Sequence, residues 1–351
     1  MDDIFTKAKR GDLIALLERY GFYIRKVGSA YRSSRCPACG ASDNKTSTKL
    51  YITSEWWFCF ACGRGGDIIT AVQILEQLSP KEAAEWLLGQ HDMTAVKKPP
   101  LPSTTRTIEI NKARLKVAYG LVRIASSASG PRRKIWAYLQ EKRGIPEAII
   151  RESLKKKINY FLPDNPFVLN RVIREELEEP LLKESGLLSD TGVIKNIVLQ
   201  RPIISPFRER GRIIGLQLRA ITEVHPKTLS LVRSGLWWWP GAEKDTLCIV
   251  EGVIDMMSLV AMGWKGSILG LPGVGLVKKA LKVLTGPLKG KKTFIALDGD
   301  EAGRGATDKI LEACPSASVI PLPEGRDLND LLMEGIKDWR DLNIVEERQV
   351  A

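Results

Sequence analysis

Four of the six cysteines fall into two Cys-x2-Cys pairs, and this spacing constrains the fold more than any other feature of the 351-residue chain. The pairs are Cys36 with Cys39 and Cys59 with Cys62, with residues 40–58 between them. Two such pairs at this separation are typical of a tetrahedral zinc site, and a glycine follows each pair, where the turn favours positive φ. We therefore predict one structural Zn²⁺ held by the four thiolates.

The net charge and the composition favour a protein that binds nucleic acid. Lys and Arg number 53 against 41 Asp and Glu, a net charge of +12, which favours a polyanionic partner and nucleic acid ahead of a membrane surface. The chain has no run of 18 uncharged apolar residues and no secretory leader at Met1, so we expect a cytoplasmic, nucleoid-associated protein. With only two histidines, histidine-based catalytic triads are poor candidates.

The length predicts two or three domains, and changes in pattern indicate where they lie. A zinc module with flanking helices is followed by a Pro-rich linker, a basic region of mixed helices and strands, a region of alternating strands and helices, and a tail. The expected boundaries are 1–90, 91–107, 108–245, 246–335 and 336–351.

Acidic residues directly follow the buried strands expected in residues 246–335. Apolar runs at 247–250, 267–269, 293–297 and 317–320 alternate with helical spacing, which is typical of a largely parallel sheet. Ligands gather at the carboxyl ends of such strands. The acids found there are Glu251, Asp298, Asp300, Asp327 and Asp330.

These acids have two interpretations. As helix N-caps they would serve only local structure, because Asp favours the first turn of a helix. As a cluster at one sheet edge they would repel one another unless divalent cations bound there, which predicts a site for two or more Mg²⁺ or Mn²⁺ ions. The occurrence of acids after three successive strands favours the second interpretation.

The acidic motifs, in this order, resemble the TOPRIM domain of bacterial-type primases and of type IA and type II topoisomerases. They are Glu251-Gly252 with Asp255, the run 298–303 (Asp-Gly-Asp-Glu-Ala-Gly) and the run 325–330 (Gly-Arg-Asp-Leu-Asn-Asp). Residues 138–145 and 201–219 resemble the catalytic core of bacterial primases, and residues 36–69 and 83–87 are similar to the primase zinc-binding domain. The resemblance to bacterial or phage-type DNA primases covers residues 10–335.

The resemblance implies a fold and an activity. The fold would be α/β (α+β), with an N-terminal zinc ribbon and a primase core that contains a parallel-sheet TOPRIM domain. The enzyme would make short RNA primers on single-stranded DNA by two-metal nucleotidyl transfer, with Glu251, Asp298, Asp300 and Asp327 as catalytic metal ligands and Asp330 as a secondary candidate. It would act as a monomer, with nucleoside triphosphates as substrates and a separate replicative helicase as partner.

The sequence departs from the family pattern at two positions. Cys39 stands where bacterial replicative primases usually have histidine, and Asn329 stands where the last motif often has a second aspartate. The sequence also ends about 20 residues after the TOPRIM pattern, without a helicase-interaction domain, which suggests a phage, plasmid or other mobile element.

Basic and aromatic residues are candidates for holding nucleotides and template. By the resemblance we expect Arg201 and Arg219 to contact them, and Arg208, Arg210 and Arg212 either join them or form a solvated turn around Gly211. Trp57 is the candidate for stacking on template bases. The alternatives are a TOPRIM nuclease, a topoisomerase fragment and a zinc-ribbon binder of single-stranded nucleic acid without catalysis.

Overall fold

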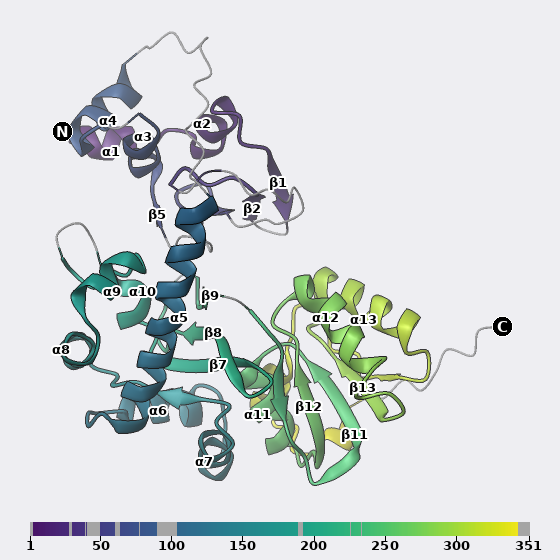
Figure 1. Cartoon of the computed structure of the whole chain (residues 1–351). Helices are drawn as coiled ribbons and strands as arrows, with labels where there is room; N and C mark the ends of the chain where they lie inside the picture. Colours follow the sequence, from purple (N-terminus) through teal and green to yellow (C-terminus); the bar gives the residue numbers. More distant parts are fainter. Residues whose placement is uncertain are drawn as a thin grey trace. The chain divides into compact units, whose positions relative to one another are not determined.

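The computed structural model describes residues 3–27, 30–38, 40, 50–59, 64–76, 78–89, 104–188, 192–224, 226–232 and 234–342, without the side chains of 104–110, 196–197 and 274. The chain forms two compact units, one of residues 1–113 with 182–193 and the other of residues 114–181 with 194–351. Figure 1 shows their helices and strands. In the described residues, no helix is both long enough and apolar enough to span a bilayer.

The first unit is a small antiparallel sheet flanked by short helices. Its elements are α1 (Ile4–Ala8), α2 (Leu13–Arg19), β1 (Ile24–Val27), β2 (Ala30–Ser33), β3 (Leu50–Ile52), β4 (Trp57–Cys59), β5 (Gly65–Gly66), α3 (Ile68–Glu76) and α4 (Pro80–Leu88), with the strands in sequential order. Asp12 begins α2 by accepting hydrogen bonds from the backbone of Ile14 and Ala15, both at 2.9 Å. The core contains the fully buried Leu17 and Trp57.

The second unit begins with helices and an antiparallel sheet. The helices are α5 (Thr104–Ser127, which starts in the first unit), α6 (Arg133–Glu141), α7 (Glu147–Lys155), α8 (Pro166–Glu176), α9 (Glu179–Glu184, which ends in the first unit) and α10 (Asn196–Leu199). The sheet has the order β6 (Tyr160–Phe161), β7 (Ile203–Glu209), β8 (Arg212–Arg219) and β9 (Thr228–Val232). A tight turn at Arg210 and Gly211, both with positive φ, joins β7 to β8 as the sequence predicted.

A second sheet follows, with the order β10-β12-β11-β13-β14. Its strands are β10 (Trp237–Trp239), β11 (Glu243–Val250), β12 (Gly266–Gly270), β13 (Lys292–Ala296) and β14 (Ser318–Val319), and its helices are α11 (Val253–Ala261), η1 (Val274–Leu276), α12 (Val277–Leu284), α13 (Glu301–Ala313), α14 (Leu328–Met333) and η2 (Trp339–Asp341). All neighbouring strands are parallel except the β10–β12 pair. The expected largely parallel sheet and the mixed α/β fold are confirmed.

Helices cover both faces of this sheet (Figure 1). Leu247 and Ile249 of β11 pack with residues of α12 and α13, whereas Cys248 and Val250 pack with residues of α11 and α14. The alternation follows from the two-residue period of a strand, and it explains why these strands are apolar throughout. The sheet is therefore rigidly supported where its strands end.

Two expected boundaries differ from the structure. Helix α5 begins at Thr104, inside the segment 91–107 that was expected to be linker, because no proline follows Pro102 before Pro131. The rest of that segment lies outside the described residues. Strand β11 begins at Glu243, so the expected boundary after residue 245 cuts through a strand, and the hydrophobic core of the second unit extends to both sides of it.

Candidate active site and template surface

Carboxylates from the loops after three neighbouring strands, β11, β13 and β14, act on one another at the carboxyl ends of the parallel strands. Glu251 follows β11, Asp298 and Asp300 follow β13, and Asp327 follows β14. Glu251 and Asp298 share a hydrogen bond, and the charges of Asp300 and Asp327 act on both. The structure thus brings together the four acids that the sequence predicts.

Burial and mutual repulsion perturb this cluster strongly. Burial, the hydrogen bond with Glu251 and the neighbouring charges raise the pKa of Asp298 to about 9. Burial is also the largest cause that raises the pKa of Glu251, although its hydrogen bond with Asp298 opposes the shift. Crowded carboxyl groups of this kind are stable as anions only when cations bind among them.

A fifth acid, Asp255, belongs to the same cluster. It lies on α11 at 7 % exposure, and its Oδ2 accepts a hydrogen bond from the Gly252 backbone at 2.9 Å. Its Oδ1 is buried and has no hydrogen-bond partner among the described residues. Burial and the charges of Asp327 and Asp298 raise the pKa of Asp255 to about 7, against the attraction of Arg219. The motif marked this residue, but the sequence analysis gave it no role.

The donor set fits divalent cations. Carboxylate oxygens are the ligands that Mg²⁺ and Mn²⁺ prefer, and the unpartnered Oδ1 of Asp255 leaves one buried oxygen without hydrogen-bond compensation. Among the described residues, no three Asp, Glu, His or Cys side chains lie close enough together to hold a metal ion. In its described residues the structure therefore presents an acidic rim and not a closed ligand cage.

Two of the acids also cap helices, as the first interpretation of the sequence predicted. Asp300 accepts a hydrogen bond from the Gly303 backbone at 2.7 Å and begins α13. Asp327 and Asp330 form a capping box at the start of α14, with bonds of 2.7 and 3.2 Å between side chain and backbone. Asp330 lies in addition 3.6 Å from Nε of Arg326, which makes it the poorer candidate for a metal ligand.

Backbone contacts tie the loop after β13 to the loop after β14. The Gly299 nitrogen donates to the carbonyl of Arg326 at 3.0 Å, and the Gly325 nitrogen donates to the carbonyl of Gly299 at 3.2 Å. Nη1 of Arg304 donates to the same Gly299 carbonyl at 2.8 Å. A Cβ at position 299 would clash with the carbonyl oxygen of Pro323, which explains why glycine separates the two aspartates.

A hydrogen-bonded chain links strand β8 to the acidic rim. Nε of Arg219 and Nε of Arg143 donate to the Tyr138 hydroxyl at 3.3 and 3.0 Å. Arg143 Nη1 donates to Asn329 Oδ1 at 3.1 Å, and Asn329 Nδ2 donates to the Arg143 carbonyl at 2.7 Å and to Ser258 Oγ at 3.0 Å. The charge of Arg219 acts on Asp255, so Arg219 lies beside the site, and its contact with nucleotide or template stays a prediction. The sequence analysis missed Arg143 although its motif was recognised.

The remaining predicted arginines divide into two groups. Arg201 is only 3 % exposed, and its Nη2 donates to the Pro226 carbonyl at 2.5 Å, so the structure gives it a packing role in place of the nucleotide contact expected for it. Arg208, Arg210 and Arg212 are exposed around the β7–β8 turn. This exposed position is the one expected for a solvated turn, and a contact of these arginines with template stays a prediction.

The described part of the zinc module has the local geometry of a metal-binding knuckle. The Ala38 nitrogen donates to Cys36 Sγ at 3.3 Å, Cys36 and Gly40 exchange backbone hydrogen bonds, and Gly40 has φ +83°. Cys36 and Cys59 are buried and form no disulfide. Cys39 and Cys62 lie outside the described residues, so the complete ligand set stays a prediction.

The template contact predicted for Trp57 is wrong. Its side chain is 0 % exposed and its Nε1 donates to the Asp67 carbonyl at 3.3 Å, so the ring belongs to the core of the first unit. The opposite face of the sheet carries Arg25, Arg32, Tyr51 and Phe58, which lie opposite one another across β1–β4. We call these four residues the aromatic row.

The aromatic row combines rings and positive charge. The Arg32 guanidinium lies 4.5 Å from the centre of the Tyr51 ring, and Trp56 stacks on Tyr51 with centroids 5.2 Å apart and an interplanar angle of 27°. Arg25 is exposed and the other members are half-buried. Such a surface suits single-stranded nucleic acid, because bases stack on rings while cations attract phosphates.

Two models of known protein families match this chain, one over the zinc module and one over the region of the acidic rim. Residues 2–100 match the family model of the CHC2 zinc finger, and residues 248–332 match that of the Toprim-like domain. The chain joins a CHC2 zinc finger to a Toprim-like domain. The resemblance inferred from the cysteine and acidic motifs is thereby confirmed.

Curated relatives of the chain are bacterial DNA primases. The DNA primase of Aquifex aeolicus is 28 % identical over 353 residues, covering 95 % of this chain and 66 % of the relative, and that of Borreliella burgdorferi is 22 % identical over 358 residues, covering 96 % and 67 %. The chain spans between about half and two thirds of the length of such relatives. A crystal structure of the zinc-binding and RNA polymerase domains of the Aquifex aeolicus primase is 24 % identical, covers 98 % of this chain and 87 % of that one, and has a TM-score of 0.46.

Proposed function

We propose that the chain is a DNA primase, an enzyme that joins ribonucleotides into short RNA primers on a single-stranded DNA template. The observation that carries the proposal is the gathering of Glu251, Asp298, Asp300 and Asp327 at the carboxyl ends of the neighbouring strands β11, β13 and β14. The similarity of nearly the whole chain to DNA primases supports it.

The acidic rim is the proposed catalytic centre. Glu251, Asp298, Asp300 and Asp327 would hold two or more Mg²⁺ or Mn²⁺ ions, with Asp255 completing the buried side of the cluster. When bound, such ions activate an attacking hydroxyl and stabilise a leaving phosphate oxygen. The 3′-hydroxyl of the growing strand attacks the α-phosphorus of the incoming triphosphate, and pyrophosphate leaves.

The arginines beside the rim have a complementary role. Arg219 and Arg143 both donate to the Tyr138 hydroxyl, and the charge of Arg219 acts on Asp255 of the cluster. Guanidinium groups in that position attract the triphosphate and neutralise the charge that develops as pyrophosphate departs. Tyr138 and Asn329 keep both arginines oriented toward the site.

The first unit would inspect the template. We propose that one Zn²⁺, held by Cys36, Cys39, Cys59 and Cys62, maintains its fold and that the aromatic row stacks on template bases. The proposed partners are single-stranded DNA, nucleoside triphosphates and a separate replicative helicase that exposes the template.

The decisive experiment measures incorporation of labelled ribonucleotides on single-stranded DNA without added primer, with Mg²⁺ or Mn²⁺. We expect short products from the zinc-loaded protein and none from the Asp298→Ala variant. Metal-dependent loss of the input DNA would identify a nuclease instead. Salt-sensitive DNA binding without any product, under either metal, would overturn the catalytic proposal in favour of a binding protein.

A further inference from the structure

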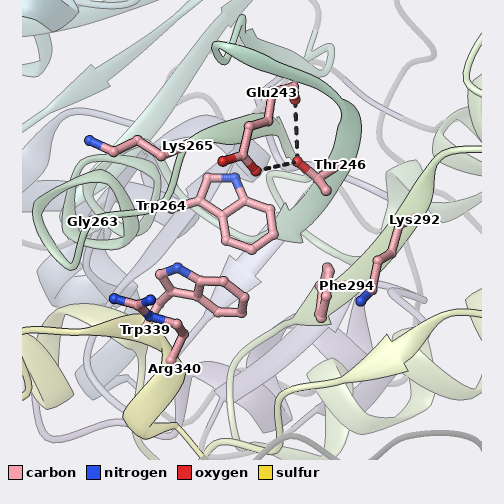
Figure 2. A pocket seen from close by; sticks show the side chains of 9 residues that line it. All are labelled: Glu243, Thr246, Gly263, Trp264, Lys265, Lys292, Phe294, Trp339 and Arg340. Atoms are coloured by element: carbon pink, nitrogen blue, oxygen red, sulfur yellow. Dashed lines mark hydrogen bonds between the residues drawn. The ribbon is translucent and has the colours of Figure 1, made fainter.

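A cavity lies at the edge of the Toprim-like sheet opposite the acidic rim. It has a volume of about 410 Å³ and opens where the parallel strands begin (Figure 2). Its walls come from the starts of β11 and β13, the loop before β12, and η2. The lining residues used below are Glu243, Trp264, Lys265, Lys292, Phe294 and Trp339.

Three aromatic rings form a corner of this cavity. Trp264 and Trp339 have centroids 4.7 Å apart at 78°, and Phe294 stands edge-to-face to both, at 5.3 and 5.6 Å. The Trp339 backbone nitrogen donates to the Met262 carbonyl at 2.9 Å, and Trp264 Nε1 donates to the Ser267 carbonyl at 3.3 Å. The corner is thus fixed in shape, and the half-buried Trp339 offers ring surface to a ligand.

Positive charge surrounds the corner. Lys265 and Lys292 are exposed and, within the described part of the chain, neither forms an ion pair. Lys292 Nζ lies 5.3 Å from the Phe294 ring centre, so its charge sits over the aromatic wall. Lys292 is the last residue but one of the stretch Gly286–Thr293. This stretch has three residues between its glycines, where a P-loop has four, and it has no part in the proposed catalysis.

The cavity lining also includes one acidic side chain, Glu243, which can accept hydrogen bonds. The Glu243 carboxylate accepts a hydrogen bond from the Thr246 hydroxyl at 3.4 Å (Figure 2). The other charged residues that line the cavity are basic, so the Glu243 carboxylate is its one acidic acceptor among the residues that line it. A matching ligand has a flat ring for the aromatic corner, an anionic group for the two lysines, and an amino or hydroxyl donor for Glu243.

We propose that this cavity binds a nucleotide unit separately from the active site. The base lies against Trp339 in the aromatic corner, the phosphate contacts Lys265 and Lys292, and Glu243 accepts from a base amino group or a ribose hydroxyl. A bare inorganic anion would leave the rings unused, and a purely apolar ligand would desolvate the lysines without compensation. The unit is either a free nucleoside triphosphate or one residue of a single strand.

Photo-crosslinking of the full zinc-loaded chain tests the proposal and separates the two sources. In buffer without Mg²⁺ or Mn²⁺, the protein is irradiated with 8-azido-ATP in one arm and with a 5-iodouridine-containing DNA oligonucleotide in the other. Crosslinked peptides are mapped by mass spectrometry. The test variant is Lys265→Glu with Lys292→Glu, and the matched control is Lys282→Glu with Lys309→Glu, a charge reversal at exposed positions of α12 and α13.

We expect label on peptides that contain Trp264, Phe294 or Trp339, reduced at least about tenfold in the test variant and retained in the control. Label from 8-azido-ATP that unlabelled ATP displaces identifies a free nucleotide, and label from the oligonucleotide alone identifies a strand. The proposal is overturned if neither probe labels these peptides, or if the test variant is labelled as strongly as the control. Because the readout is the labelled peptide, it is independent of primer synthesis at the acidic rim.

Discussion

The carboxyl groups of Glu251 and Asp298 share one hydrogen bond although they follow two different strands. Two carboxyl groups can be this close only if they share a proton or a cation lies beside them. In the metal-free protein the pair shares one proton, because burial and the neighbouring carboxyl group raise the pKa of Asp298 to about 9. Binding of a divalent cation would displace this proton.

Asp298→Asn should therefore separate stability from catalysis. The amide can still donate to Glu251 but carries no negative charge, so we expect the metal-free variant to melt at or above the temperature of the parent protein. Primer synthesis should fall by at least about 100-fold, as when a group that stabilises developing charge is removed. Asp308→Asn, at an exposed position of α13, is the matched control and should change neither quantity. Unchanged synthesis in D298N would remove Asp298 from the catalytic centre.

The stability of the metal-free protein should fall as pH rises. The pKa of Asp298 is raised to about 9 and that of Asp255 to about 7, against about 3.9 in an unfolded chain. The folded state thus binds more protons, and the stabilisation present at pH 4 is lost as pH passes through the folded pKa values. In thermal melts without Mg²⁺ or Mn²⁺, the melting temperature should fall between pH 5 and pH 9. In the Asp255→Asn variant this fall should be less steep below about pH 7, the folded-state pKa of Asp255. A melting temperature that rises over this range would contradict the acidic cluster.

The acids and cysteines could be found from the sequence because their chemistry depends on residue type and spacing. The alternation of strands and helices in residues 246–335 and the Gly211 turn were predictable from the same kind of pattern. Which aromatic side chain faces solvent was not predictable, because the three neighbours Trp56, Trp57 and Phe58 fit either register and a shift of one residue reverses the faces. Burial of Arg201 likewise depends on segments that are distant in the sequence.

Removal of zinc should unfold the first unit and leave the second folded. Structural zinc in small modules supplies roughly 10–16 kcal/mol of binding energy that is also folding energy. After chelation, we expect limited proteolysis to degrade residues before about 100 while the Toprim-like sheet survives. Cys36→Ser and Cys59→Ser should reproduce the effect, whereas Cys314→Ser, in the second unit, should not. A protease-resistant first unit at a measured zinc content of zero would contradict the prediction.

Tyr51→Ala should weaken binding to single-stranded DNA more than primer synthesis on saturating template. Loss of one base-stacking ring costs about 1–3 kcal/mol, which corresponds to roughly 5- to 150-fold in affinity. Fluorescence anisotropy with a labelled oligonucleotide measures the change. Phe5→Ala, on helix α1 of the same unit and 36 % exposed, provides the control. Equal affinities for the two variants would exclude the aromatic row as the template surface.

Asn329→Asp should destabilise the protein without improving metal binding, although aspartate is frequent at this position in the family that the chain resembles. Asn329 is 1 % exposed, and its amide nitrogen donates to both the Arg143 carbonyl and Ser258 Oγ. A carboxylate cannot donate to the carbonyl, so a buried acceptor loses its partner at a cost of about 1–3 kcal/mol. Chemical denaturation measures the loss, and titration with Mn²⁺ measures affinity. A stable N329D variant with tighter Mn²⁺ binding would show that this position is a metal ligand and not the tether that orients Arg143.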